Sequence, residues 1–567
     1  MSRLEKLRQC SSLSDLAILI GYKPRSLGYF IHQVDDDSKY SEFSIPKKTG
    51  GSRLISAPNS KLSAIQSRLS GLLYDCIDEI NKSRGIDDSL SHGFRRKRSI
   101  YSNAAVHTGK RYVFNVDIKD FFTSINFGRV RGFLVKNNNF QLKEPVATAI
   151  AQICCYKAVL PQGAPTSPVI SNLIGHILDI RLANMALRFG CDYSRYADDI
   201  TFSCNKKTFP KEMARQRMFA PHTWVAGRFL KRKIESSGFS LNPSKTRMQY
   251  FFSRQTVTGL TVNKKAKPSK EYCKVSRAMC DSLFKTGSAH RKIIEIADDG
   301  SEIEKIENVS LASIFGRMDH IFRGAFPDKS GPTFQDFISP KGFLKDYKKL
   351  VIYDYCLANA CPTLICEGKT DIVYIQSALR KMYKKYPKLI EKKKGDFVFK
   401  VRFVRHGKRR ARAIGIFDGA DNLTYFVKNY ANWRKSFKAA SSDNPVILVT
   451  DNDSGVMGKK KLFENVKSIT NKPCDGLEPK YAVLDQLWLV PVPKAAVASE
   501  KCIEDLFDKK TLSIKWKGMD FNYKSPPVKG KEYGKSDFAD HVIKPDYKKI
   551  DFKGFIPLLD AIDSVCP

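Results

Sequence analysis

The sequence predicts a multidomain protein of mixed α/β and α+β class, and three observations lead to this fold class. The chain has 567 residues, a length that suggests three or four packed units rather than one core. Between Arg111 and Val262, strand-like segments alternate with helical ones and hold most of the polar motifs. From about Cys361 onward, short apolar runs end in acidic residues and precede helical patterns, which is typical of a mostly parallel sheet.

Composition narrows the class of partner. The formal net charge of +39 indicates a polyanionic partner, and nucleic acid is the first candidate. Hydrophobic residues at 42% exclude bulk disorder. Because no signal-like segment and no apolar run of about 18 residues occurs, we expect a cytoplasmic protein without a membrane span. The 14 cysteines contain no CxxC pair, so neither a zinc ribbon nor a disulfide framework is expected.

Changes in pattern divide the chain into four parts, which we place at residues 1–35, 36–263, 264–345 and 360–567. The first part contains short helical segments interrupted at Gly21 and Pro24. In the second, residues 43–58 have the pattern of a hairpin around a turn at residues 48–51. The third is basic and mainly helical, and apolar residues at three- and four-residue spacing over 311–318 predict a helix with one buried face.

Three carboxylates in the second part suggest a nucleotidyl-transfer site. Asp198 and Asp199 are adjacent in the stretch YADDITF, so both can serve one site only if they lie at a sharp hairpin turn. Asp117 ends another predicted strand. Nucleotidyl transfer uses two Mg²⁺ ions, for which about three protein carboxylates suffice. An Asp-Asp pair alone is more often a solvated turn, so the neighbouring motifs decide.

Those motifs resemble the reverse transcriptases, in the order found in that family. Residues 114–122 (FNVDIKDFF) resemble the first catalytic motif, which implies that Asp117 is a metal ligand and that the ring of Phe122 excludes a ribose 2′-hydroxyl. The resemblance implies a right-hand polymerase with fingers and palm in residues 36–263 and a thumb in residues 264–345. It also implies that the enzyme uses Mg²⁺ and deoxynucleoside triphosphates to copy RNA into DNA.

Further motifs assign substrate contacts by the same resemblance. Residues 160–168 (LPQGAPTSP) are similar to the motif that positions template and nucleotide, with Gln162 at its centre. Residues 45–53 resemble a fingers hairpin in which Arg53 binds the triphosphate, because guanidinium donors suit phosphate oxygens. Lys245 resembles a lysine that protonates or neutralises the departing pyrophosphate, although a surface lysine is an equally good interpretation.

Two short elements resemble those that distinguish bacterial retron reverse transcriptases. One is an Asn-Ala-x-x-His element formed by Asn103 and His107, and the other is the triplet Val257, Thr258 and Gly259. Read alone, His107 is more often a structural histidine. The resemblance implies that the protein binds its own structured noncoding RNA and copies part of it into a branched RNA–DNA product (msDNA). We assign RNA recognition to these five residues and to the basic helical region that follows.

The fourth part carries a second set of acidic residues after apolar strands. Glu367 and Asp371 follow the run PTLIC, and Asp451 and Asp453 follow the run PVILVT. This arrangement resembles the Toprim pattern, in which carboxylates at strand ends hold Mg²⁺. If a helix began at Glu367, its carboxylate and that of Asp371 would share one face. An ordinary acidic loop is the alternative for each piece alone.

The tail of the fourth part resembles the nucleases of the overcoming-lysogenization-defect family. By that match, Glu504 completes the metal site and Lys535 stabilises charge on the cleaved phosphate. Neither a partner domain with a cleaving tyrosine, as in a topoisomerase, nor the zinc ribbon of a bacterial primase is indicated by the sequence.

We therefore expect a retron reverse transcriptase fused to a Toprim nuclease, acting in antiphage defence and associated with its RNA–DNA product, which could also hold several copies of the chain together. Two alternatives stay open. One is an intron- or CRISPR-associated reverse transcriptase with a processing nuclease. The other is an RNA-binding scaffold with an idle Toprim site. The target of the nuclease is not predicted by the sequence.

Overall fold

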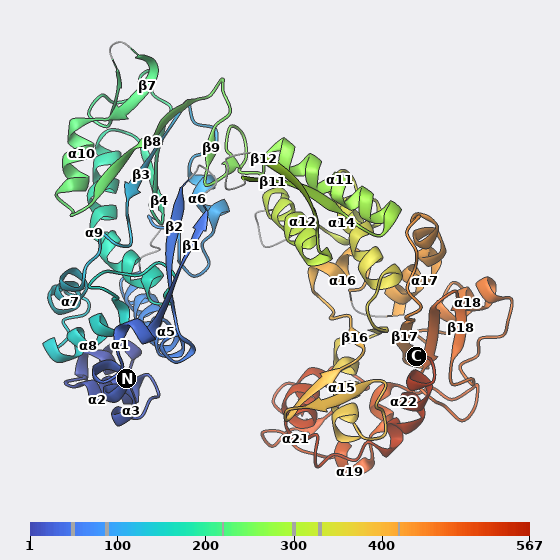
Figure 1. Cartoon of the computed structure of the whole chain (residues 1–567). Coiled ribbons are helices and arrows are strands. Elements are labelled where there is room, and N and C mark those ends of the chain that lie inside the picture. The colour runs from blue at the N-terminus through green and yellow to red at the C-terminus, as the bar shows by residue number, and fades with distance from the viewer. Residues whose placement is uncertain (47–50, 86–89, 218–219, 297–301, 327–330, 418–419) are drawn as a thin grey trace. The chain divides into compact units, whose positions relative to one another are not determined.

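The structure, a computed structural model, describes the chain except for residues 47–50, 86–89, 218–219, 297–301, 327–330 and 418–419. The chain divides into two compact units, Met1–Ser269 and Lys270–Pro567 (Figure 1). Each unit has hydrophobic clusters of its own. The described helices include none long and apolar enough to cross a membrane.

The first unit contains ten helices and ten strands among its described residues. The helices are α1 (Arg3–Gln9), α2 (Leu13–Leu19), α3 (Pro24–His32), α4 (Asp36–Lys39), α5 (Ser60–Ser83), α6 (Ile100–Val106), α7 (Phe127–Lys136), α8 (Glu144–Cys154), α9 (Ser167–Arg188) and α10 (Arg228–Glu235). The strands are β1 (Tyr40–Pro46), β2 (Ser52–Pro58), β3 (Tyr112–Lys119), β4 (Asp192–Tyr196), β5 (Asp199–Cys204), β6 (Ala214–Arg217), β7 (Ala220–Ala226), β8 (Ser240–Tyr250), β9 (Thr256–Val257) and β10 (Leu260–Thr261).

The three short helices at the N-terminus begin and end at local signals, as predicted. The hydroxyls of Ser2 and Ser12 accept hydrogen bonds from the third residue of α1 and of α2, which caps both helices. Gly21 adopts a φ of +75° after α2, a left-handed conformation that favours glycine. Pro24 is the first residue of α3, where its missing amide hydrogen is not needed.

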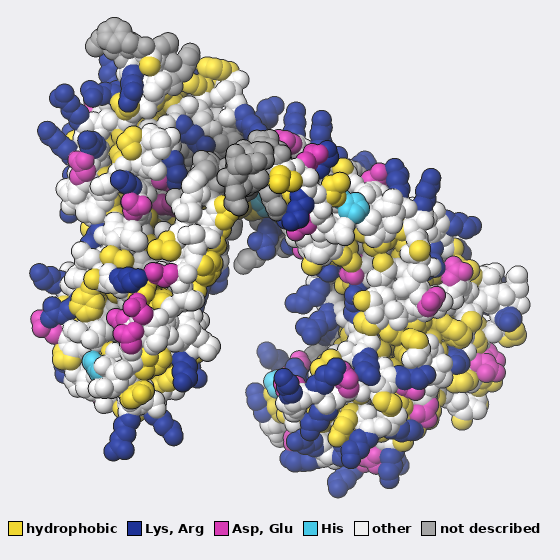
Figure 2. Space-filling view, in the orientation of Figure 1, with side chains coloured by type: hydrophobic (Ala, Val, Ile, Leu, Met, Phe, Trp, Pro, Cys, Tyr) yellow, Lys and Arg dark blue, Asp and Glu magenta, His cyan; other side chains and the backbone are white. Residues whose placement is uncertain are grey.

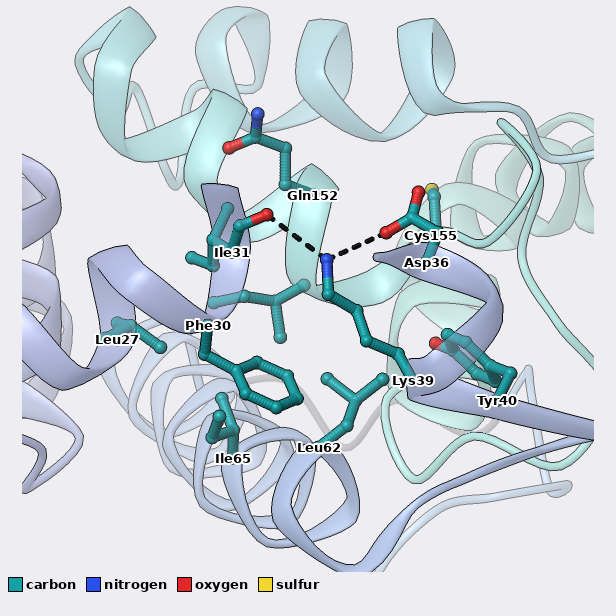
Figure 3. A pocket seen from close by; sticks show the side chains of 11 residues that line it. Leu27, Phe30, Ile31, Asp36, Lys39, Tyr40, Leu62, Ile65, Gln152 and Cys155 are labelled. Carbon is teal, nitrogen blue, oxygen red and sulfur yellow. Dashed lines mark hydrogen bonds and ion pairs between the residues drawn. The ribbon is translucent and has the colours of Figure 1, made fainter. Parts of the chain in front are cut away.

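Helices α3 and α4 meet at a buried lysine (Figure 3). Lys39 Nζ donates to the Ile31 carbonyl oxygen at 3.2 Å and to Asp36 Oδ1 at 2.8 Å, so the charge of this 7% exposed residue is compensated. The cavity beside it has a volume of about 10 Å³, room for about one water molecule. The lysine therefore ties α3 to α4, and the cavity is too small for a substrate.

A four-stranded antiparallel sheet in the order β4-β5-β3-β8 forms the centre of the first unit. Residues 113–118 of β3 are all buried, which requires cover on both faces of the sheet. Helix α9 packs against β4, and α10 packs against β8 (Figure 1). The sheet thus holds the ends of β3, β4 and β5 in fixed register.

The predicted hairpin before this sheet is present. Strands β1 and β2 pair antiparallel from Tyr40 opposite Pro58 to Pro46 opposite Ser52. Part of the predicted turn, residues 48–50, lies outside the described residues.

The second unit contains twelve α-helices and eleven strands among its described residues, with short 3₁₀- and π-helical turns between them. The helices are α11 (Lys270–Thr286), α12 (Leu311–Ala325), α13 (Phe334–Ile338), α14 (Phe343–Ile352), α15 (Lys369–Lys381), α16 (Arg409–Ala413), α17 (Ala420–Lys435), α18 (Leu462–Thr470), α19 (Lys509–Leu512), α20 (Lys535–Asp537), α21 (Lys544–Asp546) and α22 (Ile556–Asp563). The strands are β11 (His290–Ile296), β12 (Glu302–Asn308), β13 (Thr363–Cys366), β14 (Ile390–Lys393), β15 (Asp396–Phe399), β16 (Arg402–Phe403), β17 (Val446–Thr450), β18 (Tyr481–Leu484), β19 (Leu487–Pro491), β20 (Asp520–Phe521) and β21 (Glu532–Tyr533).

The sheet of the second unit is mostly parallel, as predicted. Its order is β16-β13-β17-β19-β18, and only the β18–β19 pair is antiparallel. All residues of β13 and β17 are buried, which explains why both read as continuous apolar runs. Residues 311–318 fall in α12, with its apolar face buried.

Helices that follow Lys270 share one hydrophobic cluster with residues 404–489. The cluster joins Phe315 and Met318 of α12 and Leu350 of α14 to residues such as Phe426 and Leu448. Between α11 and α12 the chain also forms the antiparallel hairpin β11–β12, which a mainly helical reading did not include. Residues 303–308 of β12, Ile303 and Ile306 among them, are exposed.

Candidate functional site

The three carboxylates predicted in the first unit meet at one end of its central sheet. Strand β4 ends at Tyr196 and β5 begins at Asp199, so Ala197 and Asp198 form the turn of a tight hairpin. Asp117 lies directly opposite Asp199 in the antiparallel register, and the amide of Ile118 donates to the Asp198 carbonyl oxygen at 3.0 Å. The hairpin turn inferred from sequence alternation is therefore present.

Charge is crowded at this end of the sheet. Burial raises the pKa of Asp117, the hydrogen bond from Lys245 lowers it, and the charge of Asp198 raises it. The pKa of Asp199 is raised to about 6, first by desolvation among neighbouring protein atoms and then by the charges of Asp198 and Asp117, although its side chain still reaches solvent. A cation placed among these carboxylates would offset both their burial and their mutual repulsion.

Lys245, on β8, supplies one cation. Its Nζ lies 2.8 Å from Asp117 Oδ2, and Asn242 Nδ2 donates to Asp117 Oδ1 at 3.4 Å. Desolvation lowers the pKa of Lys245, but the hydrogen bond and charge of Asp117 raise it overall. The lysine that was expected near pyrophosphate therefore pairs with the predicted metal ligand in this structure.

The carboxylates suit Mg²⁺ in chemistry, because it prefers hard oxygen donors and keeps room for water and phosphate oxygens. Within the described part of the chain, no group of three or more His, Cys, Asp or Glu side chains is already arranged to hold a metal ion. The carboxylates of Asp117, Asp198 and Asp199 therefore provide oxygen donors that are not yet arranged around a common metal position.

The two phenylalanines after Asp117 have different surroundings. Phe121 is 3% exposed and stacks on Phe239 with ring centres 5.8 Å apart, so it is a core residue. Phe122 is half-buried, and its ring centre lies 6.0 Å from that of Phe94. Of the pair, Phe122 is the one with a face left to meet a substrate.

The loop before α9 contacts the hairpin β1–β2. The amide of Ser56 on β2 donates to the Gln162 carbonyl oxygen at 2.8 Å. Gly163 has a φ of +125°, and a Cβ there would lie 2.9 Å from the Ser56 carbonyl oxygen, so only glycine fits. Arg53 is exposed on β2, opposite Ile45. The structure thus joins two motifs that are about 100 residues apart.

The two elements at Asn103 and Val257 pack against each other. Thr258 and Gly259 have φ values of +46° and +80° and form the tight turn between β9 and β10. Val257 lies in a small buried cluster with Tyr101 and Ala104 of α6. The two elements therefore share one small buried cluster.

His107 is buried beneath the central sheet. Its Nδ1 lies 2.7 Å from Ser203 Oγ and its Nε2 lies 2.7 Å from Ser194 Oγ, and Ser194 Oγ also donates to Asn103 Oδ1 at 2.7 Å. Burial lowers the pKa of His107 to about 3, so the ring is neutral. Because Asn103, His107 and Val257 are at most 1% exposed, their side chains cannot touch RNA directly. Their role in RNA recognition stays a prediction. These three side chains could contribute only indirectly, by supporting the turn at Thr258 and Gly259.

In the second unit, the predicted acidic residues follow parallel neighbouring strands. Glu367 follows β13 and Asp451 follows β17, and the amide of Asp451 donates to Glu367 Oε2 at 3.2 Å. Thr450 Oγ1 donates to the same oxygen at 2.7 Å. Burial raises the pKa of Glu367, whereas the Thr450 hydrogen bond lowers it. Asp453 Oδ1 accepts from the Gly455 amide at 2.8 Å, in the loop after Asp451.

Asp371 is buried close to these groups but has a local partner. Helix α15 begins at Lys369, so Glu367 precedes it and the shared helix face considered from the sequence is not formed. Asp371 Oδ2 instead accepts from the Gly368 amide at 2.8 Å and caps the helix. Burial and the charges of Glu504 and Glu367 raise the pKa of Asp371 to about 7.

Glu504 and Lys535 complete this group. Lys535 Nζ lies 2.9 Å from Glu504 Oε2, and the glutamate side chain is fully buried. Asp451 Oδ1 accepts a hydrogen bond from the Ile503 amide at 2.8 Å. Because Ile503 directly precedes Glu504, this bond holds the Glu504 segment at the end of β17. Burial, followed by the charges of Asp371, Glu367 and Glu504, raises the pKa of Asp451 to about 8. Four carboxylates and one lysine therefore influence one another at the ends of β13 and β17.

Comparisons with known proteins cover mainly the first unit. The sequence model of the family described as reverse transcriptase (RNA-dependent DNA polymerase) matches residues 45–273. The retron Ec86 reverse transcriptase of Escherichia coli is 32% identical over 251 residues, which are 44% of this chain and 71% of that protein. The chain belongs to the retron reverse transcriptase family.

Two retron relatives from Myxococcus xanthus are also similar. The retron Mx162 reverse transcriptase is 32% identical over 54% of this chain and 64% of its own length, and the retron Mx65 reverse transcriptase is 36% identical over 47% and 61%. The chain thus spans less than two thirds of these two relatives. A solved telomerase from Candida albicans is 12% identical, covers 55% of this chain and 59% of its own, and has a TM-score of 0.30, a likeness too distant to support an inference.

In this member of the retron family, sequence reasoning missed one buried pair behind the carboxylates. Arg195 and Asp179 are both 0% exposed and form an ion pair at 2.6 Å. The available signal was an arginine in the middle of the strand that leads to Tyr196. A charged residue there is either at an exposed edge or paired, and the sequence alone did not identify its partner.

Basic side chains account for the net charge. Figure 2 shows Lys and Arg side chains spread over the visible face of each unit rather than gathered in one patch. The positive charge is therefore distributed over this face of each unit.

Proposed function

We propose that the chain is an RNA-directed DNA polymerase that copies its own structured noncoding RNA into a branched RNA–DNA. The observation that carries this proposal is the convergence of Asp117, Asp198 and Asp199 at one end of the central sheet. Membership of the retron family supports the proposal that the template is a structured noncoding RNA. When bound, Mg²⁺ held by these carboxylates would activate the attacking hydroxyl and neutralise the leaving pyrophosphate.

The remaining residues of this site would select and orient the substrates. Phe122 would exclude a ribose 2′-hydroxyl with its half-buried ring. Gln162, tied to β2, would position the nascent base pair, and the exposed guanidinium of Arg53 would bind the triphosphate. Lys245 would leave Asp117 as the cation enters and then lie near the departing phosphates. The exposed turn at Thr258 and Gly259, and the basic helices after Lys270, would contact the noncoding RNA.

The test is the double substitution Asp198→Asn with Asp199→Asn. It removes two carboxylates while retaining similar volume, so the protein should remain folded and still bind RNA. We expect DNA synthesis on a primed RNA template to disappear, with unchanged circular dichroism and RNA affinity. Retained synthesis by the double variant would refute the proposal. The alternative of a pure RNA-binding scaffold predicts no synthesis by the wild-type protein.

We further propose that the second unit cleaves phosphodiester bonds with a metal ion, as a Toprim-type nuclease acting in antiphage defence. The observation that favours it is the group of Glu367, Asp371, Asp451 and Glu504 at the ends of β13 and β17, in which burial raises the pKa of the first three and neighbouring carboxylates raise it further. Asp453 would assist in metal binding. Lys535 would stabilise charge on the cleaved phosphate.

This second activity is tested with labelled single- and double-stranded DNA and RNA in the presence of Mg²⁺ or Mn²⁺, before and after digestion of bound nucleic acid. We expect cleavage that Asp451→Asn removes while DNA synthesis continues. Cleavage that is equal in wild type and Asp451→Asn would exclude this site, and no cleavage of any substrate would favour an idle second unit. A processing nuclease attached to another class of reverse transcriptase would instead cut the RNA that copurifies with the chain.

A further inference from the structure

The turn that carries Asp198 is supported from beneath by a buried arginine. Arg195 Nη1 donates to the carbonyl oxygen of Ala197 at 3.0 Å. Ala197 has a φ of +56°, a left-handed conformation that is unfavourable for alanine. This carbonyl belongs to the residue directly before Asp198, so its orientation sets the path of the turn.

Arg195 is itself fixed by Asp179 on α9. The guanidinium forms two parallel hydrogen bonds, from Nε to Asp179 Oδ1 at 2.6 Å and from Nη2 to Asp179 Oδ2 at 2.7 Å. Such a bidentate pair fixes direction as well as distance. Tyr193 OH donates to Asp179 Oδ1 at 2.7 Å, and the guanidinium lies 5.6 Å from the ring centre of Phe121. Every side of the pair is therefore occupied by protein atoms.

A second contact supports the same turn from behind. Gly93 approaches so closely that a Cβ would lie 2.5 Å from the Ala197 nitrogen. Asn172, also on α9, donates through Nδ2 to the Gly93 carbonyl oxygen at 2.7 Å and accepts from Arg195 Nη2 at 3.3 Å. One helix thus holds the turn through both Arg195 and Gly93.

The same helix begins directly after the loop of Gln162 and Gly163. Its first residue, Ser167, donates through Oγ to the Pro161 carbonyl oxygen at 2.7 Å. A rigid helix therefore connects the nucleotide-positioning loop at its N-terminus with the supports of the carboxylate turn further along. We infer that Asp179 and Arg195 are positioning residues that hold Ala197 in its left-handed conformation and so keep Asp198 and Asp199 placed for metal binding.

This inference rests on the proposed polymerase function, and a conservative substitution tests it. Arg195→Lys keeps the charge but loses the fork that spans Asp179 and Ala197. We expect kcat to fall at least tenfold, the Mg²⁺ concentration for half-maximal rate to rise several-fold, and KM for the nucleotide to change less than twofold. Asp179→Asn should act in the same direction.

A matched control separates positioning from general destabilisation. Gln66 is also 0% exposed and donates to Tyr40 OH on β1 at 2.9 Å and to the Ile153 carbonyl oxygen on α8 at 2.8 Å. Gln66→Leu should lower thermal stability without changing the Mg²⁺ dependence. Equal shifts of Mg²⁺ dependence in Gln66→Leu and Arg195→Lys would overturn the inference.

A rescue experiment tests the conformational part directly. Glycine adopts a positive φ without the cost that alanine carries. Ala197→Gly should therefore restore several-fold of the rate lost in Arg195→Lys, although it gives no gain in the wild-type background. Absence of any rescue would show that Arg195 does not act through the conformation of residue 197.

Mn²⁺ binding measured by electron paramagnetic resonance provides a readout independent of catalysis, with Asp198→Asn plus Asp199→Asn as the background for other sites. Weaker Mn²⁺ binding in Arg195→Lys supports the inference even if the wild-type protein makes no DNA, an outcome that would refute only the proposed function. Unchanged Mn²⁺ binding in Arg195→Lys would overturn the inference.

Discussion

Lys245 and Asp117 form an ion pair in which Nζ lies 2.8 Å from Oδ2, at the carboxylate that is proposed to bind metal. The ammonium and a metal ion would compete for the same oxygen. Lys245→Met should therefore bind Mn²⁺ several-fold more tightly at pH 8 but synthesise DNA at least tenfold more slowly, because charge near the leaving phosphates is lost. Paramagnetic resonance and single-turnover kinetics measure the two effects. Lys245→Arg, which keeps a cation, is the control, and weaker Mn²⁺ binding in Lys245→Met would contradict the competition.

Substitution of Phe122 should change sugar selection. Phe122→Ala removes the half-buried ring proposed to meet the 2′-hydroxyl, so the ratio of kcat/KM for deoxynucleotides to that for ribonucleotides should fall at least tenfold. Phe121→Ala is the control, because its ring is in the core and its loss should cost about 3–5 kcal/mol of stability without changing the ratio. Unchanged selectivity in Phe122→Ala would show that this ring does not act as the gate.

His107 should remain neutral throughout the physiological range. Its pKa in the folded protein is about 3, against about 6.5 in an unfolded chain. The unfolded state therefore takes up a proton between these values and the folded state does not, so folding becomes less stable as pH falls from about 6.5 toward 3, by up to about 1.4 kcal/mol per pH unit.

The measurement is NMR of ¹³C-labelled histidine, with the His107 signal identified by its absence in His107→Gln. The other eight histidines provide internal comparison. The His107 signal should not shift between pH 8 and pH 5. A midpoint near pH 6 would contradict a buried, neutral ring held between two serines.

Glu504 and Lys535 should be coupled in stability. Lys535→Met leaves the buried Glu504 carboxylate without its cation, and the expected cost is about 1–3 kcal/mol because the lysine side chain is 39% exposed and partly screened. Adding Glu504→Gln should recover much of that loss. Denaturant unfolding of the two single variants and the double variant measures the coupling, and strictly additive losses would argue against it.

Binding of RNA should depend steeply on salt. The net charge of +39 implies many phosphate contacts, each of which releases counterions. We expect affinity for a structured RNA to fall by about 10³-fold or more between 50 and 200 mM salt. Filter binding over a salt series checks this, and a nearly flat dependence would show that the basic residues serve another purpose.

Local patterns explain what the sequence could predict. The tight turn at Asp198 and Asp199 was predicted because alternation in a strand is a property of neighbouring residues. The apolar runs before Glu367 and Asp451 were likewise predicted as buried strands from neighbouring residues alone. The strand that was predicted to end at Asp117 continues to Lys119 in the structure.

Partners distant in sequence explain what it could not. The pairing of Arg195 with Asp179 depends on how α9 packs on β4, and no spacing rule identifies it. His107 was assigned to RNA recognition from its motif, yet its partners, Ser194 and Ser203, lie on two strands nearly a hundred residues away. The start of α15 at Lys369 rather than Glu367 reflects the cap made by Asp371.

Side chains of the helices after Lys270 find partners beyond residue 400. Lys348 Nζ donates to Tyr425 OH at 2.8 Å, Arg409 pairs with Asp319 at 2.8 Å, and Arg402 pairs with Asp354 at 2.9 Å. These links accompany the hydrophobic cluster shared by the same segments. A gene shortened near codon 360 would therefore yield a protein whose last helices lack the partners that residues 404–489 supply in their hydrophobic cluster. Loss of DNA synthesis from such a truncation would report misfolding, so genetic separation of the two proposed activities requires point substitutions within the 567-residue chain.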